Sequence, residues 1–308
     1  EIKNIERRIT EEIIGNAEVI CCTNIGAGHH ILGEKKFPIV LIDEATQASE
    51  PSALVPITRG CRQLFLVGDH KQLPPTVLSK EANGLEISLF ERLINSNLEP
   101  KLLNTQYRMH PVIREFPSMR FYENKLLDGD GLEKRDTPAG FIWPDWDAPV
   151  AFVPVSGHET QDEFGKSRSN IDEAALTMSI LDSLVAAGDL SPEDVGIISP
   201  YAAQIRLLKN LVEESNNPDF YAGVEMQSVD GFQGREKEVI IMSTVRSNPT
   251  GELGFLKDAR RLNVAITRAK RGLILIGNPV TLSHDHNWKG MLDWIEERNL
   301  MAWHMVHT

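Results

Sequence analysis

The sequence predicts an α/β protein with parallel sheets, because short apolar segments alternate with segments of helical periodicity along the chain. The segments 38–42 and 63–67 are almost continuously apolar, which is typical of strands covered on both faces. A second series of such segments follows at 150–155, 195–199, 238–245 and 272–276. We therefore expect two α/β domains, each with helices packed on a parallel sheet.

Composition narrows the class of protein. The 308 residues suffice for two domains, and 41% hydrophobic with 25% charged residues is the balance of a soluble globular protein. No apolar run approaches the roughly 18 residues of a membrane span, so we expect no membrane partner. The formal net charge of −12 argues against a generally basic surface, but it allows a local basic groove.

The cysteines form no C-x-x-C pair, which disfavours a metal site. Cys21 and Cys22 follow Val19 and Ile20, so we predict buried strand thiols there, and Cys61 stands alone. Free thiols indicate a reducing compartment, cytosolic or nuclear.

One helix is predicted in detail. Asn170 can cap its start with Glu173 three residues later, and Gly188 suits its end. Its expected buried face comprises Ile171, Ala174, Ala175, Met178, Leu181 and Val185. The segment 129–149 is rich in Gly, Pro, Asp and Trp, which predicts an irregular excursion, that is, a long segment without regular secondary structure.

Acidic and amide side chains follow the first two predicted strands. Asp43 and Glu44 come directly after the first, where one carboxylate can hold Mg²⁺ and its neighbour can polarise a water. Gln72 follows the second, and its amide can donate to a phosphate or orient water. Ligands of parallel sheets collect at the carboxyl ends of strands. A solvated loop after each strand is the alternative reading.

Aromatic and cationic residues stand together in two later segments. Tyr107 and Arg108 offer a ring for a base and a cation for a phosphate, although a half-buried Tyr and a surface Arg explain them equally well. Arg261 and Arg268 are expected on one face of a helix, with a solvated basic face as the alternative. The loop 229–236 contains two glycines, Gly231 and Gly234, that allow close backbone approach.

Five segments in this order, 41–47, 67–75, 106–111, 229–236 and 260–268, resemble the motifs of superfamily 1 helicases. They are most similar to the nonsense-mediated-decay up-frameshift and senataxin-like RNA helicases. The resemblance implies two RecA-like domains, 1–105 and 106–308, with the first incomplete at its N-terminus. The loop Val-Asp-Gly-Phe-Gln-Gly-Arg-Glu differs from the Ser-Lys-Gly-Leu-Glu type of the 3′-to-5′ branch and favours the opposite polarity.

The resemblance also implies roles for residues. For the nucleotide it implies Asp43 as the Mg²⁺ residue, Glu44 as the base, Gln72 as the γ-phosphate sensor, Tyr107 as the adenine stack, Arg108 as a phosphate contact, Arg268 as the arginine finger, and Glu236 and Gly234 near the ribose. For the nucleic acid it implies Thr23, Ser199, Pro200, Tyr201 and Asn248. Each of this second group is explained equally well as a strand end or a turn.

The implied activity is ATP-driven 5′-to-3′ translocation on single-stranded RNA, with DNA as the alternative and ATP in the inter-domain cleft. A phosphate-binding loop, G-x-x-x-x-G-K-[ST], is expected before Asp43 and is not present, so we expect this chain to be part of a longer protein and to hydrolyse ATP negligibly alone. The segment 165–167 only imitates such a loop and is assigned to an exposed acidic loop. The competing class is an inactive helicase-like module that binds RNA or a protein partner.

Overall fold

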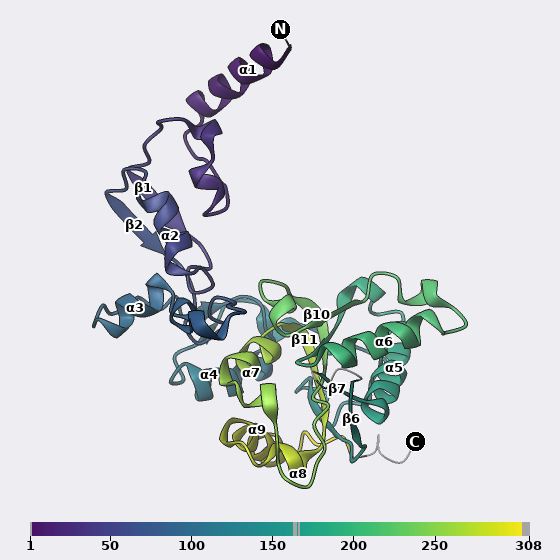
Figure 1. Cartoon of the computed structure of the whole chain (residues 1–308). Coiled ribbons are helices and arrows are strands. Elements are labelled where there is room, and N and C mark those ends of the chain that lie inside the picture. The colour runs from purple at the N-terminus through teal and green to yellow at the C-terminus, as the bar shows by residue number, and fades with distance from the viewer. Residues whose placement is uncertain (1, 163–164, 166, 304–308) are drawn as a thin grey trace. The chain divides into compact units, whose positions relative to one another are not determined.

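The structure is a computed structural model that describes residues 2–162, 165 and 167–303. The chain divides into two compact units, 1–101 and 102–308, which are described separately below (Figure 1). The division expected from the sequence lies slightly later, after residue 105, and stays a prediction for the folding domains. Among the described residues, no helix combines the length and the apolar character needed to cross a membrane.

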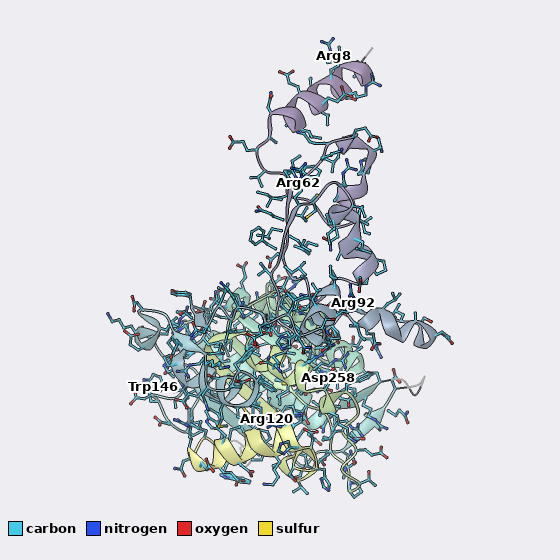
Figure 2. All side chains as sticks on the ribbon, turned by 90° about the vertical axis from the view of Figure 1, so that its left-hand side faces the viewer. Arg8, Arg62, Arg92, Arg120, Trp146 and Asp258 are labelled. Carbon is cyan, nitrogen blue, oxygen red and sulfur yellow. The ribbon has the colours of Figure 1, made fainter. Side chains whose placement is uncertain are left out.

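Unit 1 is built on one βαβ element. Strands β1 (Ile39–Ile42) and β2 (Gln63–Leu66) pair in parallel, and helix α2 (Glu50–Ile57) connects them. Arg92, labelled in Figure 2, joins α3 to α2 through two 2.7 Å hydrogen bonds to Glu50. The other helices of the unit are α1 (Ile2–Asn16) and α3 (Leu89–Asn95), with 3-10 turns η1 (Gly26–Gly28), η2 (His30–Leu32) and η3 (Lys80–Glu86).

Two expectations about unit 1 are wrong. Strand β1 is covered on one face only, because Val40 and Ile42 are buried whereas Ile39 and Leu41 are 60% and 63% exposed. Cys21 and Cys22 are exposed thiols rather than buried strand residues. The segment around them is irregular and pairs with no strand that the structure describes, so its apolar sequence did not produce a strand.

Unit 2 is built on a five-stranded sheet in which every pairing is parallel. The strand order is β5-β11-β10-β8-β9. The bounds are β5 (Val150–Pro154), β8 (Val195–Ser199), β9 (Glu225–Ser228), β10 (Lys237–Ser243) and β11 (Ala269–Gly277). Strands β5 and β8 are buried at every residue, as their continuous apolar sequences predict. The α/β class with parallel sheets is therefore confirmed. Strand β9 was not predicted, because its Glu-Met-Gln-Ser sequence is largely polar.

Helices and short ladders surround this sheet. The helices are α4 (Pro111–Phe121), α5 (Ile171–Ala186), α6 (Ala202–Glu213), α7 (Ala259–Ile266), α8 (Pro279–Leu282) and α9 (His286–Glu297). The 3-10 turns are η4 (Leu132–Lys134), η5 (Pro192–Asp194), η6 (Pro218–Tyr221), η7 (Asp230–Phe232) and η8 (Gly254–Lys257). Strands β3 (Thr105–Gln106) and β4 (Leu127–Asp128) pair in parallel, and β6 (Glu159–Gln161) and β7 (Arg168–Asn170) pair antiparallel.

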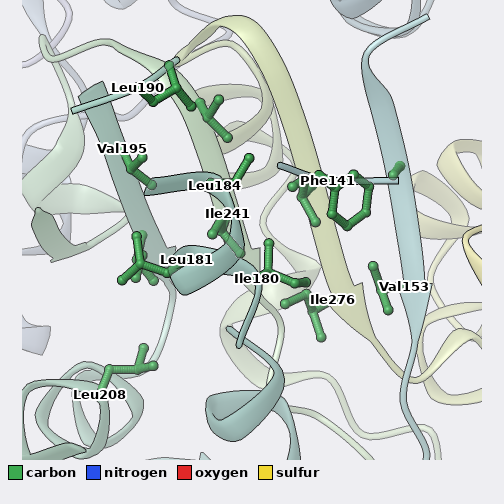
Figure 3. Close-up of a cluster of buried hydrophobic side chains, with 14 of the residues drawn as sticks. Phe141, Val153, Ile180, Leu181, Leu184, Leu190, Val195, Leu208, Ile241 and Ile276 are labelled. Carbon is green, nitrogen blue, oxygen red and sulfur yellow. The ribbon is translucent and has the colours of Figure 1, made fainter. Parts of the chain in front are cut away.

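A hydrophobic core lies between the sheet and helices α5 and α6 (Figure 3). Ile180, Leu181 and Leu184 of α5 pack against it with Ile241 and Ile276 of the strands. The excursion 129–149 also contributes, because Phe141 and Trp143 are buried in the same core. The irregular segment therefore covers part of the sheet.

Helix α5 begins and ends as predicted, but its buried face is rotated. The Asn170 side chain accepts a 3.1 Å hydrogen bond from the Glu173 backbone N–H, and Gly188 has a φ of +77° after the helix. Ala174 and Leu181 are buried as expected, whereas Ile171 is 52% exposed and Ala175 is exposed. Glu173 is fully buried, and it displaces the expected apolar residues because it meets polar groups at the ends of the strands.

Gly165 and Ser167 lie between the strands of the hairpin β6–β7, and Gly165 is exposed, as expected for an exposed loop. Lys166 lies outside the described residues. Glu159 is not a solvated acid, since its side chain is 9% exposed and binds Arg168 and Arg246 at 2.9 and 2.8 Å. Two arginines therefore neutralise the Glu159 carboxylate beside this loop.

Candidate functional site

The acidic pair of unit 1 lies at the carboxyl end of β1. Asp43 and Glu44 are both exposed, and the Glu44 backbone N–H donates to Asp43 Oδ1 at 2.9 Å. Glu44 has a φ of +51°, a left-handed conformation that only a tightly held loop imposes on a glutamate. The Gln47 amide donates to Glu44 Oε2 at 2.7 Å and so orients this carboxylate.

The loop after β2 lies beside the acidic pair, because β1 and β2 are parallel neighbours. A Cβ at Gly68 would be 3.0 Å from the Thr46 backbone nitrogen, so a glycine permits this approach of the two loops. The Gln72 amide donates to Asp69 Oδ2 at 2.7 Å. The two strand ends predicted from the sequence therefore present Asp43, Glu44 and Gln72 at one edge of the sheet.

These groups fit a magnesium ion that takes most of its ligands from water and phosphate. Magnesium needs hard oxygen ligands, and proteins commonly supply only one or two carboxylates. Asp43 offers an exposed carboxylate of this kind. Among the described residues, no group of three or more His, Cys, Asp or Glu side chains is arranged to hold a metal. A bound ion would therefore depend on the nucleotide for the rest of its shell.

Thr23 lies apart from any strand. Its hydroxyl accepts a 3.0 Å hydrogen bond from the Gly26 backbone N–H and starts the turn η1. Of the two alternatives, a strand end and a turn, the structure shows the turn, because residues 17–23 form no strand. Thr23 is exposed, so a contact with nucleic acid stays a prediction.

In unit 2, Arg108 reaches two other motif segments. Its Nε donates to Glu236 Oε2 at 2.5 Å, and its Nη1 donates to the Thr267 carbonyl at 3.1 Å. Lys270 binds the other Glu236 oxygen at 3.2 Å. Burial raises the pKa of Glu236, but the hydrogen bonds and charges of Arg108 and Lys270 outweigh it and hold that pKa below its ordinary value. Lys270 was missed from sequence, although it follows Arg268 by two residues.

Arg268 lies in the turn between α7 and β11. The expectation that it shares a helix face with Arg261 is wrong, because α7 ends at Ile266 and Thr267 is its C-cap. Arg268 is 3% exposed, which excludes a solvated basic face. Its Nε donates to the Val264 carbonyl at 3.0 Å and its Nη2 to the Thr267 hydroxyl at 2.9 Å. Arg108 and Arg268 therefore both bind Thr267, one at its carbonyl and one at its side chain.

The loop 229–236 connects β9 to β10 as predicted. Gly234 has a φ of +76°, which a glycine adopts without strain. A Cβ there would meet no atom within 4 Å, so its backbone is open to a ligand. The Gln233 Nε2 is buried, and no hydrogen-bond partner for it is found among the described residues. The loop that contains Glu236 thus carries both an accessible backbone and a buried donor without a hydrogen-bond partner among the described residues.

The other residues expected to bind nucleic acid lie at the carboxyl end of β8 or in the segment that follows β10. Ser199 and Tyr201 are buried, and the Tyr201 hydroxyl donates to the Leu253 carbonyl at 2.8 Å. Pro200, between them, is half-buried. Asn248 binds Glu159 and the Glu252 carbonyl at 3.1 and 2.8 Å and so closes its own loop. These side chains shape the surface, and their direct contact with nucleic acid stays a prediction.

A pocket of about 600 Å³ opens beside Tyr201. It is lined by the cations Arg168, Arg246 and Lys257 and by the ring of Phe255. The Arg246 side chain is 4% exposed, and its Nη2 makes no hydrogen bond with any residue that the structure describes, although it lies within ion-pair distance of Glu252, at 3.8 Å. Sequence reasoning missed Arg246, although it directly follows the predicted apolar segment 238–245.

The position of Arg246 follows from a buried polar network. Glu173 Oε2 accepts hydrogen bonds from the Ser243 hydroxyl at 2.7 Å and the Val245 backbone N–H at 2.8 Å. Val245 has a φ of +72°, which is rare for a β-branched residue. Asn170 donates to the Val245 carbonyl at 3.2 Å. The network holds a strained turn that directs Arg246 away from the strand.

Two AAA domain families match this chain, one over residues 85–280 and the other over residues 1–80. The parallel sheets and the motif loops at their strand ends therefore belong to a protein of the AAA domain class.

Curated relatives narrow the class further. The chain is 43% identical to the regulator of nonsense transcripts 1 homolog of Neurospora crassa, over 97% of this chain and 28% of the relative. It is 44% identical to the ATP-dependent helicase NAM7 of Saccharomyces cerevisiae, over 96% and 31%. The chain belongs to the superfamily 1 helicases of the regulator-of-nonsense-transcripts type. It spans less than a third of the length of these two relatives.

Among solved structures, an arterivirus nonstructural protein 10 helicase in complex with DNA is similar with a TM-score of 0.41 and 16% identity. The similarity covers 82% of this chain and 42% of that one.

Proposed function

We propose that the protein containing this chain hydrolyses ATP to move 5′-to-3′ along single-stranded RNA, with DNA as an alternative track. The proposal rests most on one observation: Arg108 and Arg268, from distant segments, both bind Thr267, and Arg108 also binds Glu236 of a third segment. Two guanidinium groups that bind the same residue place positive charge close together. Such an arrangement suits a phosphoryl group, because its negative charge increases during the reaction.

Unit 1 would supply the water-activating chemistry. Glu44, which Gln47 orients, would accept a proton from the attacking water. Gln72 would contact the terminal phosphate through its amide. Mg²⁺ held through Asp43 would neutralise phosphate charge and orient its oxygens.

Unit 2 would bind the nucleotide and stabilise the transition state. Tyr107 is 70% exposed and can stack on the base. Arg108 and Arg268 would oppose phosphate charge, and Glu236 would accept a hydrogen bond from a ribose hydroxyl while still holding Lys270. Each carboxylate oxygen has more than one lone pair, so the ion pairs leave room for this contact.

The pocket beside Tyr201 supports the nucleic-acid part of the proposal. Arg246, Arg168 and Lys257 line this space together with the Phe255 ring, and the one acidic side chain among its lining residues is Glu252, which lies 3.8 Å from Arg246 Nη2. Cations and aromatic rings favour binding that follows phosphates and tolerates any sequence.

RNA-stimulated ATP turnover by the full-length protein tests the proposal. Asp43→Asn and Glu44→Gln should each abolish turnover, because they remove the metal contact and the base, whereas Glu34→Gln, an exposed carboxyl of the same unit, should not. Turnover that survives both site changes would contradict the assigned chemistry and favour a binding module.

A further inference from the structure

We propose that Gly129 sets the position of the Tyr107 ring and is thereby a determinant of nucleotide affinity. The inference rests on the proposed function, since it needs Tyr107 to contact the base. An ideal Cβ at Gly129 would be 2.2 Å from Tyr107 Cε1 and 2.3 Å from Cδ1. Real Cβ atoms do not approach so closely, so the ring occupies space that any other residue at 129 would fill.

The short β3–β4 ladder creates this approach. Gln106 pairs with Asp128, and the Gly129 backbone N–H donates to the Gln106 carbonyl at 2.8 Å. Tyr107 and Gly129 therefore leave the two strands side by side. The ring lies against backbone rather than against a mobile side chain, which fixes one side of it.

The Gln106 amide fixes the backbone that carries the ring. Its Oε1 accepts from the Arg108 and Met109 backbone N–H groups at 2.8 and 2.7 Å, and its Nε2 donates to the Met109 carbonyl at 2.8 Å. The same Nε2 donates to Asp128 Oδ1 at 2.8 Å. One side chain thus ties the Tyr107–Arg108 turn to the residue that precedes Gly129.

Asp128 is in turn held by Arg114 of α4. The guanidinium binds both Asp128 oxygens, at 3.1 and 2.6 Å. Burial raises the pKa of Asp128, but the hydrogen bonds of Arg114 and Gln106 outweigh it and lower that pKa. The carboxylate therefore stays charged, and α4 anchors the ladder that presents the ring.

Replacing Gly129 should move the ring without unfolding the unit. The φ of Gly129 lies outside the left-handed region, so alanine is compatible with its backbone. Tyr107 is 70% exposed and can rotate into solvent to avoid the new methyl group. The displaced ring then no longer offers its surface where the base would stack.

The test measures nucleotide dissociation constants of the full-length protein with a fluorescent ATP analogue. Gly129→Ala should weaken binding about tenfold and raise KM for ATP, while kcat at saturating ATP changes less than about twofold, because stacking acts on the ground state. The control is Gly290→Ala, in helix α9, where a Cβ meets nothing within 4 Å and affinity should not change.

A double-mutant cycle separates positioning from general damage. If Gly129 acts through the ring, Gly129→Ala should have no further effect in a Tyr107→Ala background. Additive effects would overturn the inference. A 3-fluorotyrosine ¹⁹F resonance that disappears in Tyr107→Phe should shift in Gly129→Ala, and an unmoved resonance would equally overturn it.

The same variants distinguish this inference from the proposed function. If Tyr107→Ala leaves nucleotide affinity unchanged, the base contact assigned to Tyr107 is wrong. If Tyr107→Ala weakens binding and Gly129→Ala does not, the base contact stands and the role of Gly129 is wrong.

Discussion

Glu173 shows how a single buried side chain can determine a site that it does not touch. It is fully buried, and it accepts hydrogen bonds from the Ser243 hydroxyl and from the Val245 backbone N–H rather than from a cation. Burial raises the pKa of Glu173 to about 7. A turn as strained as that at Val245 persists only where its surroundings hold it, and Glu173 is part of that support.

Glu173 predicts a specific pH dependence of stability. A carboxyl with a higher pKa in the folded state keeps its proton longer when folded, so its contribution to stability is lost as pH rises from about 4.5 to about 7. Glu173→Gln removes this titration. The unfolding free energy of the wild type, relative to Glu173→Gln, should therefore fall across that window and level off above it.

Urea unfolding at several pH values measures this difference. Glu214→Gln, at an exposed carboxyl of the same unit, is the matched control and should show no such trend. Parallel pH profiles for the wild type and Glu173→Gln would mean that Glu173 titrates as an ordinary carboxyl.

At the scale of elements, strand ends were predictable and the residues that support them were not. The strand segments that lead to Asp43 and to Ser199 are short, apolar and followed by polar residues. Hydrophobic periodicity and composition are therefore enough to locate their ends. Contacts such as Arg108 with Glu236 join residues 128 positions apart, and local pattern carries no information on them. The motif resemblance nominated both residues but not Lys270 or Arg246. The prediction of the buried face of α5 was wrong for a related reason. Polar partners elsewhere in the fold buried Glu173, and this outweighed the apolar pattern of the helix.

Helix α7 depends on a cap that can be tested. Asp258, labelled in Figure 2, accepts a 2.9 Å hydrogen bond from the Arg260 backbone N–H and lies 3.3 Å from Arg261 Nη1. Asp258→Ala should lower the stability of unit 2 by about 1 kcal/mol, the usual worth of an N-cap. Asp258→Asn should restore most of it, because asparagine caps as well. If both variants lose the same amount of unfolding free energy, the ion pair with Arg261 stabilises the helix and the cap does not.

At the scale of the molecule, net charge and local charge point in opposite directions. The chain carries a formal charge of −12, yet the pocket beside Tyr201 is lined by three cations, Arg168, Arg246 and Lys257, and by one acid, Glu252. Binding of single-stranded RNA should therefore be tolerant of sequence and should weaken steeply with salt, because phosphate contacts release counterions. Unit 1 differs in another way, since Leu41 and Phe65 leave apolar surface exposed on its strands.

Arg246 makes the salt dependence specific. In the full-length protein, Arg246→Gln should weaken binding of homopolymer RNAs uniformly and reduce the slope of log K against log salt by about one. Arg298→Gln, which removes a cation paired with Glu115 on α4, should leave the slope unchanged. An unchanged slope in Arg246→Gln would show that the pocket does not hold phosphate.

The central claim is that the residues around Thr267 act on the phosphates of ATP during hydrolysis. Its most direct test is steady-state ATP turnover of the full-length Arg268→Ala variant, measured beside its nucleotide dissociation constant. The account predicts a loss of turnover by a factor of about 10³ or more, with affinity within a few-fold, because the guanidinium opposes charge that develops in the transition state. Arg268→Lys should restore little, since an ammonium lacks the planar fork. Unchanged turnover with a lowered melting temperature would contradict the account and leave Arg268 as a buried structural arginine.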